Sequence, residues 1–133
     1  MSEENVAVVR RVFATWAESD FEAFFSMAQP DIKVYPRPEE PGVKPCYEGW
    51  EELMEYLINW FSGWDEYTLE AERFIDAGDH VIVDVREVGF NRQSGIRVAE
   101  NFAHAVKLAD GKVAEWRMYG PVSEALEALA IEL

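Results

Sequence analysis

The sequence predicts an α+β fold in which a curved mixed or antiparallel sheet wraps around three N-terminal helices, giving a cone-shaped barrel. Apolar side chains recur at helical spacing through most of the first half of the chain, whereas residues from 67 onward alternate as strands. These strands read as an antiparallel meander, and amphipathic helices can cover the one face that such a meander must bury. The chain of 133 residues, 49% of them hydrophobic, is expected to form one domain over residues 1–133.

Three helices are expected in the first half. Residues 2–18 carry an apolar stripe behind Ser2, which can cap the amino end. Residues 21–28 form a second, short helix that Pro30 stops, because the residue before a proline avoids helical angles. The third helix opens at Gly49 and is broken at Gly63. Before it lie a strand at residues 31–35 and a proline-rich loop at 36–45, which we expect to cross an edge or an opening.

The second half is expected to hold four strands and a closing helix, at residues 67–76, 80–88, 96–108, 112–120 and 123–133. Side chains alternate between the two faces of a sheet, so the turns decide which residues meet. A turn centred on residues 92–93 would place Val81 opposite His104. A three-residue turn at 109–111 would place Trp116 on the other side of His104. A two-residue turn would bring Arg117 there instead, and the apolar pattern favours the three-residue turn.

Composition argues against several classes of partner. The 26 acidic and 12 basic residues give a net charge of −14, which disfavours nucleic acid and anionic membrane surfaces. No apolar stretch approaches the length of a membrane span, and the N-terminal segment lacks a secretory signal, so a cytoplasmic protein is expected. Cys46 is the single cysteine, which fits a reducing compartment. Because Cys46, His80 and His104 are widely separated and no glycine-rich phosphate loop is present, we expect no metal and no cofactor.

The predicted strand face that holds His104 is mostly apolar and should line the concave interior. An imidazole can donate or accept a proton near neutral pH, and an inward carboxylate needs a partner, so His104, Glu87 and Glu100 are the candidate catalytic residues. We expect Glu87 to share the cavity with His104 without touching it, and Glu100 to lie nearer to the ring. The alternatives are a core histidine with one hydrogen bond and glutamates that lie in water at the rim.

Aromatic side chains, 14% of the chain, exceed what a small core needs, and a lined cavity for a small hydrophobic molecule is one use for them. The candidate ligand-binding residues are Tyr35, Phe13, Trp16, Trp50, Phe102, Trp116 and Met118. An ordinary half-buried tyrosine is the favoured alternative for Tyr35, and a core position is favoured for the aromatic residues of the helices.

Several phrases resemble the SnoaL-like branch of the nuclear transport factor two-like superfamily. They are "ENVAVVRRVF", "YEGWEELMEYL", "DAGDHVIVDVREVG" and "FAHAVKLADGKVAEWRMY", and the match covers nearly the whole chain. The resemblance implies an α+β cone with an apolar pocket, often a homodimer through the outer sheet face. Independently, the face opposite His104 mixes small residues with Asp84 and Arg86, which suits packing between subunits.

Members of this group include polyketide cyclases, ketosteroid isomerases, limonene epoxide hydrolases and dehydratases, while others only bind or scaffold. Two functions are therefore open. The first is a cofactor-free isomerase, cyclase or hydratase that performs acid–base chemistry on a hydrophobic substrate, and the inward histidine and glutamate favour it. The second is a non-catalytic binding or dimeric scaffold protein. Met118 and Pro121 favour the second, because they stand where enzymes of the group often carry an aspartate.

Overall fold

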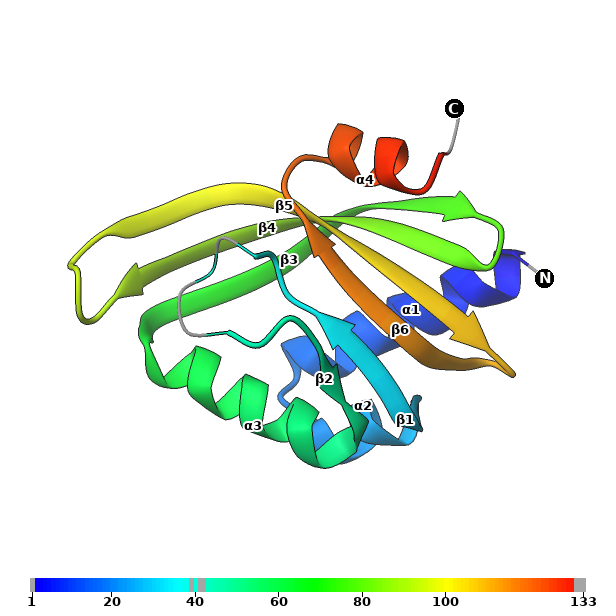
Figure 1. Cartoon of the computed structure of the whole chain (residues 1–133), viewed down its shortest axis with the longest axis horizontal. Coiled ribbons are helices and arrows are strands. Elements are labelled where there is room, and N and C mark those ends of the chain that lie inside the picture. Colours follow the sequence, from blue (N-terminus) through cyan, green and yellow to red (C-terminus); the bar gives the residue numbers. More distant parts are fainter. Residues whose placement is uncertain (1, 39, 41–42, 131–133) are drawn as a thin grey trace.

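The computed structural model describes residues 2–38, 40 and 43–130, and it has the predicted α+β architecture (Figure 1). Its elements are α1 (Ser2–Ala17), α2 (Phe21–Ser26), β1 (Ala28–Tyr35), β2 (Tyr47–Glu48), α3 (Gly49–Ser62), β3 (Trp64–Ala77), β4 (His80–Asn91), β5 (Arg97–Ala109), β6 (Lys112–Tyr119) and α4 (Val122–Ala128). Within these residues the strands form one sheet in the order β2-β1-β6-β5-β4-β3. β1 runs parallel to β6, and the other neighbours are antiparallel.

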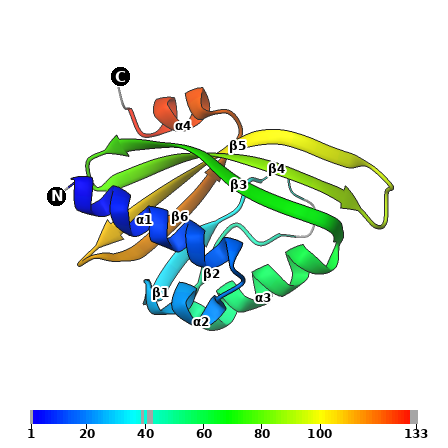
Figure 2. The ribbon, with the colours of Figure 1, turned by 180° about the vertical axis from the view of Figure 1, so that it is seen from behind.

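The sheet curves around α1, α2 and α3, which lie together on one of its faces (Figure 2). β2 and β3 form its two edges in the described part of the chain, so the sheet stays open rather than closing into a barrel. α1 packs mainly against β3, and α3 packs against β1 and β2. The main apolar core fills the space between the helices and the concave face, and it includes Val9, Val12, Ile32, Val34, Val83, Val85 and Val106. The strands that carry Glu87 and His104 are therefore anchored by a packed core.

The opposite face of the sheet carries the closing helix. α4 buries Ala125 completely in a second apolar cluster with Ile82, Ala103 and Ala105. This confirms a closing helix near the predicted place, and residues 131–133 of the predicted range lie outside the described residues. The small residues that we expected at a subunit interface are thus partly covered by the chain's own helix.

The helical half differs from expectation at α2 and at an added strand. Asp20 caps α2 by accepting a hydrogen bond from the backbone N–H of Ala23 (3.2 Å), but the helix ends at Ser26 rather than at residue 28. The reason is that β1 already begins at Ala28, and it tolerates Pro30 at an irregularity in its pairing with β6. The two-residue strand β2 was not predicted. The predicted helix cap at Ser2 depends on a side chain that the structure does not describe.

The register of the β4–β5 hairpin differs by two residues from the prediction. His104 pairs with Val83 rather than with Val81, and Glu87 pairs with Glu100. The cause is a longer turn, because the side chain of Asn91 accepts hydrogen bonds from the backbone N–H groups of residues 93 and 94 (3.0 and 2.9 Å). A shift by two residues preserves the alternation of faces, so His104 and Glu87 still point into the interior.

The β5–β6 hairpin has a two-residue turn, and the predicted three-residue turn is wrong. Asp110 and Gly111 both have positive φ angles, 53° and 75°, as a type I′ turn requires. Such a turn alone would have brought Arg117 beside His104. An irregularity next to Ala114 inserts one extra residue into β6 and restores the faces, so that Met118, and not Trp116, pairs with His104.

Candidate functional site

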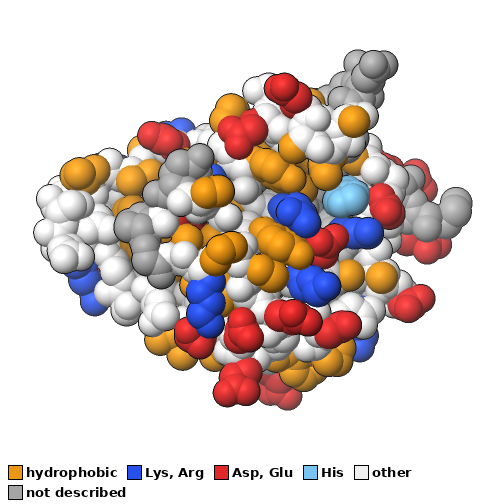
Figure 3. Space-filling view, viewed as in Figure 1, with side chains coloured by type: hydrophobic (Ala, Val, Ile, Leu, Met, Phe, Trp, Pro, Cys, Tyr) orange, Lys and Arg blue, Asp and Glu red, His pale blue; other side chains and the backbone are white. Residues whose placement is uncertain are grey.

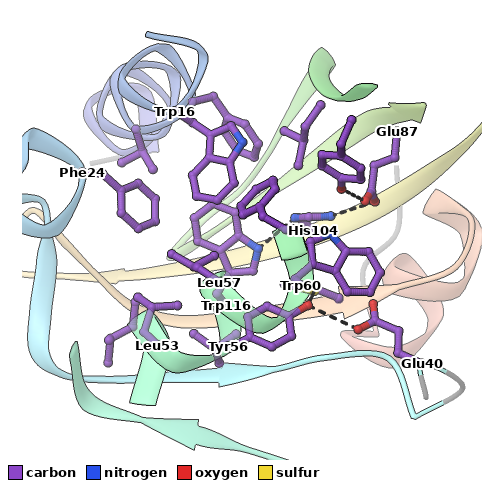
Figure 4. A pocket seen from close by; sticks show the side chains of 18 residues that line it. Trp16, Phe24, Glu40, Leu53, Tyr56, Leu57, Trp60, Glu87, His104 and Trp116 are labelled. Atoms are coloured by element: carbon purple, nitrogen blue, oxygen red, sulfur yellow. Dashed lines mark hydrogen bonds and ion pairs between the residues drawn. The ribbon is translucent and has the colours of Figure 1, made fainter. Parts of the chain in front are cut away.

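A cavity of about 60 Å³ lies between the concave face of the sheet and the three N-terminal helices (Figure 4). Much of its wall is apolar, with Phe13 and Trp16 from α1, Phe24 from α2 and Trp60 from α3. The polar side chains that line it are Glu40, Tyr56, Tyr67, Glu87 and His104. This volume is small in comparison with a cavity that binds benzene, which measures about 150 Å³.

His104 lies at the centre of this polar group and is only 4% exposed. The indole N–H of Trp116 donates a hydrogen bond to its Nδ1 atom, with a separation of 2.9 Å. The rings of Trp116 and Phe13 pack at centroid distances of 5.8 and 6.4 Å from the imidazole. The orientation of the imidazole is therefore fixed by one hydrogen bond and two aromatic contacts.

Glu87 is buried as well, and it meets His104 directly. Its Oε2 atom lies 3.6 Å from Nε2 of His104, and its Oε1 atom accepts a hydrogen bond from the hydroxyl group of Tyr67. The expectation that Glu87 and His104 share a cavity without contact is therefore wrong. In a flat sheet the side chains of Glu87 and His104 would lie too far apart to touch, whereas the concave curvature of this sheet brings them together.

The protonation of these groups follows from their surroundings. Burial by itself would raise the pKa of Glu87, but its contacts with His104 and Tyr67 and the charge of Arg37 outweigh burial and hold that pKa below its usual range. Burial and the neighbouring Glu87 charge raise the pKa of Tyr67 far above neutrality. At neutral pH Glu87 is consequently a carboxylate that accepts a hydrogen bond from the neutral phenol of Tyr67.

Tyr67 reaches Glu87 because of two local features of the sheet. A bulge in β3 between Asp65 and Thr68, with Glu66 at a φ of 51°, turns the Tyr67 side chain toward the interior. Across from it, Gly89 leaves room for the ring, since a Cβ atom there would lie 2.9 Å from both Tyr67 and Trp64. Neither feature could be predicted from strand alternation, so Tyr67 was missed as a site residue.

A second carboxylate approaches from the proline-rich loop. The hydroxyl group of Tyr56 donates to Oε2 of Glu40 (3.2 Å), and the same hydroxyl group lies 3.4 Å from the sulfur of Met118. Arg37 lies 3.9 Å from Glu40 and stacks over the ring of Phe102 at 4.0 Å. Sequence reasoning missed all three polar residues, although Tyr56 belongs to the same apolar helix face as Trp60 and could have been found there. Burial and the Glu40 charge raise the pKa of Tyr56, so it remains a donor.

A second cavity of about 220 Å³, which we call the vestibule, adjoins the first. Four residues line both cavities and form the partition between them, namely Glu40, Trp60, Tyr67 and Glu87. Glu100 and Phe102 line the vestibule only. Glu100 is exposed, and no contact between it and His104 is found, so the expectation that it lies nearer to His104 than Glu87 does is wrong.

The remaining candidate ligand-binding residues fall into three places. Phe13, Trp16, Trp116 and Met118 line the inner cavity. Tyr35 lies instead in a surface groove beside Arg117, whose guanidinium group stacks on the Tyr35 ring at 3.8 Å. Trp50 is 41% exposed, and its indole N–H donates to the backbone oxygen of Ala28. On the face of the molecule that Figure 3 shows, Lys and Arg side chains gather near the middle, and Asp and Glu side chains follow the edge formed by α3.

The described residues contain no group of three or more His, Cys, Asp or Glu side chains arranged to hold a metal ion. In the same part of the chain, every buried side-chain nitrogen or oxygen has a hydrogen-bond partner. None of the described helices has the length and hydrophobicity that a membrane span requires.

Comparisons with known proteins agree with this fold. A family model described as the SnoaL-like domain matches residues 9–116. An NTF2-like protein from Burkholderia thailandensis is 22% identical over 94% of this chain and 96% of its own, with a TM-score of 0.80. A candidate SnoaL-like polyketide cyclase from Jannaschia sp. CCS1 is 21% identical over 100% and 96% of the two chains, with a TM-score of 0.76.

A third similar structure is TerC co-crystallised with polyporic acid, which is 21% identical over 96% of this chain and 98% of that one, with a TM-score of 0.76. No curated protein sequence matches this chain significantly. At such identities the likeness to solved structures shows the fold alone.

Proposed function

This chain belongs to the SnoaL-like domain family, and we propose that it is a cofactor-free enzyme that moves a proton on a small hydrophobic substrate. The observation that carries the proposal is the buried pair of Glu87 and His104, whose facing atoms lie 3.6 Å apart at the wall of an aromatic cavity. A buried carboxylate and imidazole are costly to keep in an apolar interior. Their place at a cavity, rather than in solid packing, supports a chemical role.

The chemistry that suits these residues is transfer of a proton next to a carbonyl group. Glu87 would take the proton as the C–H bond breaks, and the electron pair of that bond would pass into the carbonyl group as an enolate. Return of the proton to another carbon completes an isomerisation. Attack of the enolate on a second carbonyl group of the same molecule, followed by protonation of the new oxygen, completes a cyclisation. Atoms and electrons balance in both cases without a cofactor.

The charge of the site supports a neutral substrate. Glu40 and Glu87 both line the partition, and Arg37 is the cation beside them. An anionic ligand would meet two carboxylates in an apolar environment, where repulsion between like charges is strong. The inner cavity alone is too small for a ring-containing substrate, so we propose that the substrate occupies the inner cavity and the vestibule together after Trp60 moves. Their combined volume approaches about 300 Å³, the lower end of the usual range for small-molecule pockets.

The second candidate is a binding protein without catalysis. The small volume of the inner cavity, about 60 Å³, supports it, as does the complete pairing of buried polar atoms among the described residues. In that case Glu87, His104 and Tyr67 would hold a hydrogen-bonding ligand in place without moving a proton.

We also propose a cytoplasmic homodimer. The outer sheet face beyond α4 carries a polar network in which Asn101 bridges Arg86, Asp84 and Glu72 at 3.1, 3.1 and 2.6 Å. This network remains available to a second copy, while α4 covers the neighbouring apolar patch. The lone Cys46 fits a reducing compartment. Sedimentation equilibrium would test the dimer.

The enzyme proposal is tested by proton exchange. The purified protein is incubated in D₂O with cyclohex-3-enone, a small β,γ-unsaturated ketone, and deuterium uptake and double-bond migration are followed by NMR. We expect the wild-type protein to accelerate both, and Glu87→Gln to lower the rate by about 10²- to 10⁴-fold, the usual contribution of a general base. Glu127→Gln is the matched control, because Glu127 is an exposed glutamate on α4.

The outcomes separate the two candidates. Binding of the ketone with no acceleration by the wild-type protein would overturn the enzyme and favour the binding protein. Equal rates for the wild type and Glu87→Gln would remove Glu87 as the base.

A further inference from the structure

The hydrogen bond between Trp116 and His104 determines where the imidazole carries its proton. An indole N–H can only donate, so the Nδ1 atom that it meets at 2.9 Å must be the acceptor. A neutral imidazole that accepts at Nδ1 carries its hydrogen on Nε2. Both side chains are buried, with 9% of Trp116 and 4% of His104 exposed, so water is poorly placed to replace either partner.

The second nitrogen of the ring, Nε2, leads to the same assignment. Nε2 points toward Oε2 of Glu87 at 3.6 Å, so its hydrogen faces a carboxylate. Turning the ring over would place carbon atoms at both positions and leave Trp116 and Glu87 without these contacts. A doubly protonated ring would set an N–H group against the N–H of Trp116. An unmade hydrogen bond at a buried donor costs about 1–3 kcal/mol, which opposes that form.

We propose that Trp116 is a positioning residue that holds His104 neutral with its proton on Nε2, and that this leaves Glu87 as the base of the site. The inference rests on the proposed function for its catalytic meaning, but the proton assignment stands on the geometry of the resting protein. His104 then has no free lone pair with which to accept a proton. Its Nε2–H instead faces the carboxylate of Glu87. When a substrate is bound, this N–H can donate to the oxygen on which negative charge develops.

The groups that face His104 come from three packed elements. Glu87 approaches from β4, Trp116 from β6 and Phe13 from α1, and Glu87 is the titratable group among them. Glu87 in turn contacts Tyr67 and feels the charge of Arg37. The carboxylate of Glu87 by itself favours a charged imidazole, whereas the indole of Trp116 opposes it. Removing the indole N–H while keeping an aromatic ring should therefore release this opposition.

The direct test is NMR of the ¹⁵N-labelled full chain. Long-range ¹H–¹⁵N spectra distinguish the two neutral tautomers and the charged ring, and a coupling across the N–H···N bond would link Trp116 Nε1 to His104 Nδ1. At pH 7 the wild-type protein is expected to show the Nε2–H tautomer and this coupling. In Trp116→Phe we expect the coupling to be lost and a larger fraction of the His104 ring to be charged. The exposed pair of His80 and Asp79 provides an internal control that should not change.

An Nδ1–H tautomer or a charged His104 in the wild type would overturn the inference, as would an unchanged His104 pattern in Trp116→Phe. The wild-type coupling keeps the test decisive if the variant fails to fold. With cyclohex-3-enone, Trp116→Phe should lower kcat by up to about 100-fold with little change in KM, as expected when a catalytic group is displaced. If the ketone does not react but the wild type shows the Nε2–H tautomer, the proposed function fails and the proton assignment stands.

Discussion

Glu87 and His104 lie on neighbouring strands four residues out of register, yet their side chains meet. His104 pairs with Val83, and Glu87 follows Val83 by four positions on β4. The facing atoms, Oε2 and Nε2, are nevertheless 3.6 Å apart. In a flat sheet such a diagonal would be too long for these side chains, because a strand rises about 3.3 Å per residue. The contact is therefore a product of sheet curvature, and changes that flatten the sheet should break it.

Glu87→Gln should destabilise the protein in a pH-dependent way. The pKa of Glu87 is lowered from an ordinary value of 4.5 in the folded state, so the charged form is the one that folding favours. Its stabilising contribution is complete above about pH 4.5 and is lost as the pH falls through the lowered value. We expect the variant to lose about 1–3 kcal/mol at pH 7, as for hydrogen bonds to a charged group. Urea unfolding at pH 7 and at pH 3.5 measures both. A stability difference that is the same at both pH values would contradict the prediction.

Tyr67→Phe should weaken the same carboxylate without removing it. The hydroxyl group of Tyr67 is one of the contacts that hold the pKa of Glu87 low, so its loss should raise that pKa and move the acid-induced loss of stability to higher pH. Tyr56→Phe is the matched control, because Tyr56 donates to Glu40 and not to Glu87. Titration of the ¹³C-labelled Glu87 carboxyl group by NMR measures the shift. Equal titration curves for the two variants would show that Tyr67 does not act on Glu87.

The faces of the strands could be predicted from the sequence, but their register could not. A pairing that differs by two residues from the predicted one leaves His104 and Glu87 on the inward face. The observed pairing around His104 differs by two residues in both hairpins. The extra turn residues that follow Asn91 and the inserted residue at Ala114 are local adjustments that a polar and apolar pattern does not reveal. For the same reason the sequence gives no warning that the two side chains touch.

The residues that sequence reasoning missed come from other elements. Glu40 lies in the loop before β2, Tyr56 on α3 and Tyr67 at a bulge of β3, and only the tertiary fold brings them to the wall of the inner cavity. Trp50 was expected at the cavity because it shares the apolar pattern of α3. Its outward position follows from the helix phase, in which the next two residues on its face, Met54 and Ile58, are also exposed.

Gly89→Ala should displace Tyr67. A Cβ atom at this position would lie 2.9 Å from atoms of the Tyr67 and Trp64 rings, closer than such atoms approach in real structures. We expect a destabilisation of about 1–3 kcal/mol, as for other overpacked sites, and a rise in the pKa of Glu87 as Tyr67 moves away. Gly63→Ala is the control, because its added Cβ would meet only a backbone oxygen at an ordinary 3.6 Å. Thermal unfolding and carboxyl titration measure the two effects. A Gly89→Ala protein that behaves like Gly63→Ala would show that the packing at this position is loose.

Trp60→Ala should join the inner cavity to the vestibule. Trp60 is the largest of the four partition residues, and the two cavities measure about 60 and 220 Å³. A dry apolar cavity of about 150 Å³ already binds benzene, so the joined space should bind small aromatic molecules more tightly than the wild type, in which Trp60 must first move aside. Removal of a large core aromatic side chain costs about 3–5 kcal/mol when it is fully buried, and the partly exposed Trp60 should cost less.

Titration with toluene and p-cresol, followed by NMR chemical shifts and by the change in Tm, measures this binding. The variant should bind both compounds, and p-cresol should bind more tightly because its hydroxyl group can donate to Glu87 or Glu40 at the partition. Trp50→Ala removes the same side chain from the same helix at a position that lines neither cavity, so it should gain no binding. If Trp60→Ala binds neither compound, the surrounding side chains collapse into the space, and a substrate site that spans both cavities is ruled out. Binding by the wild type at equal affinity would show instead that Trp60 does not separate the cavities in solution.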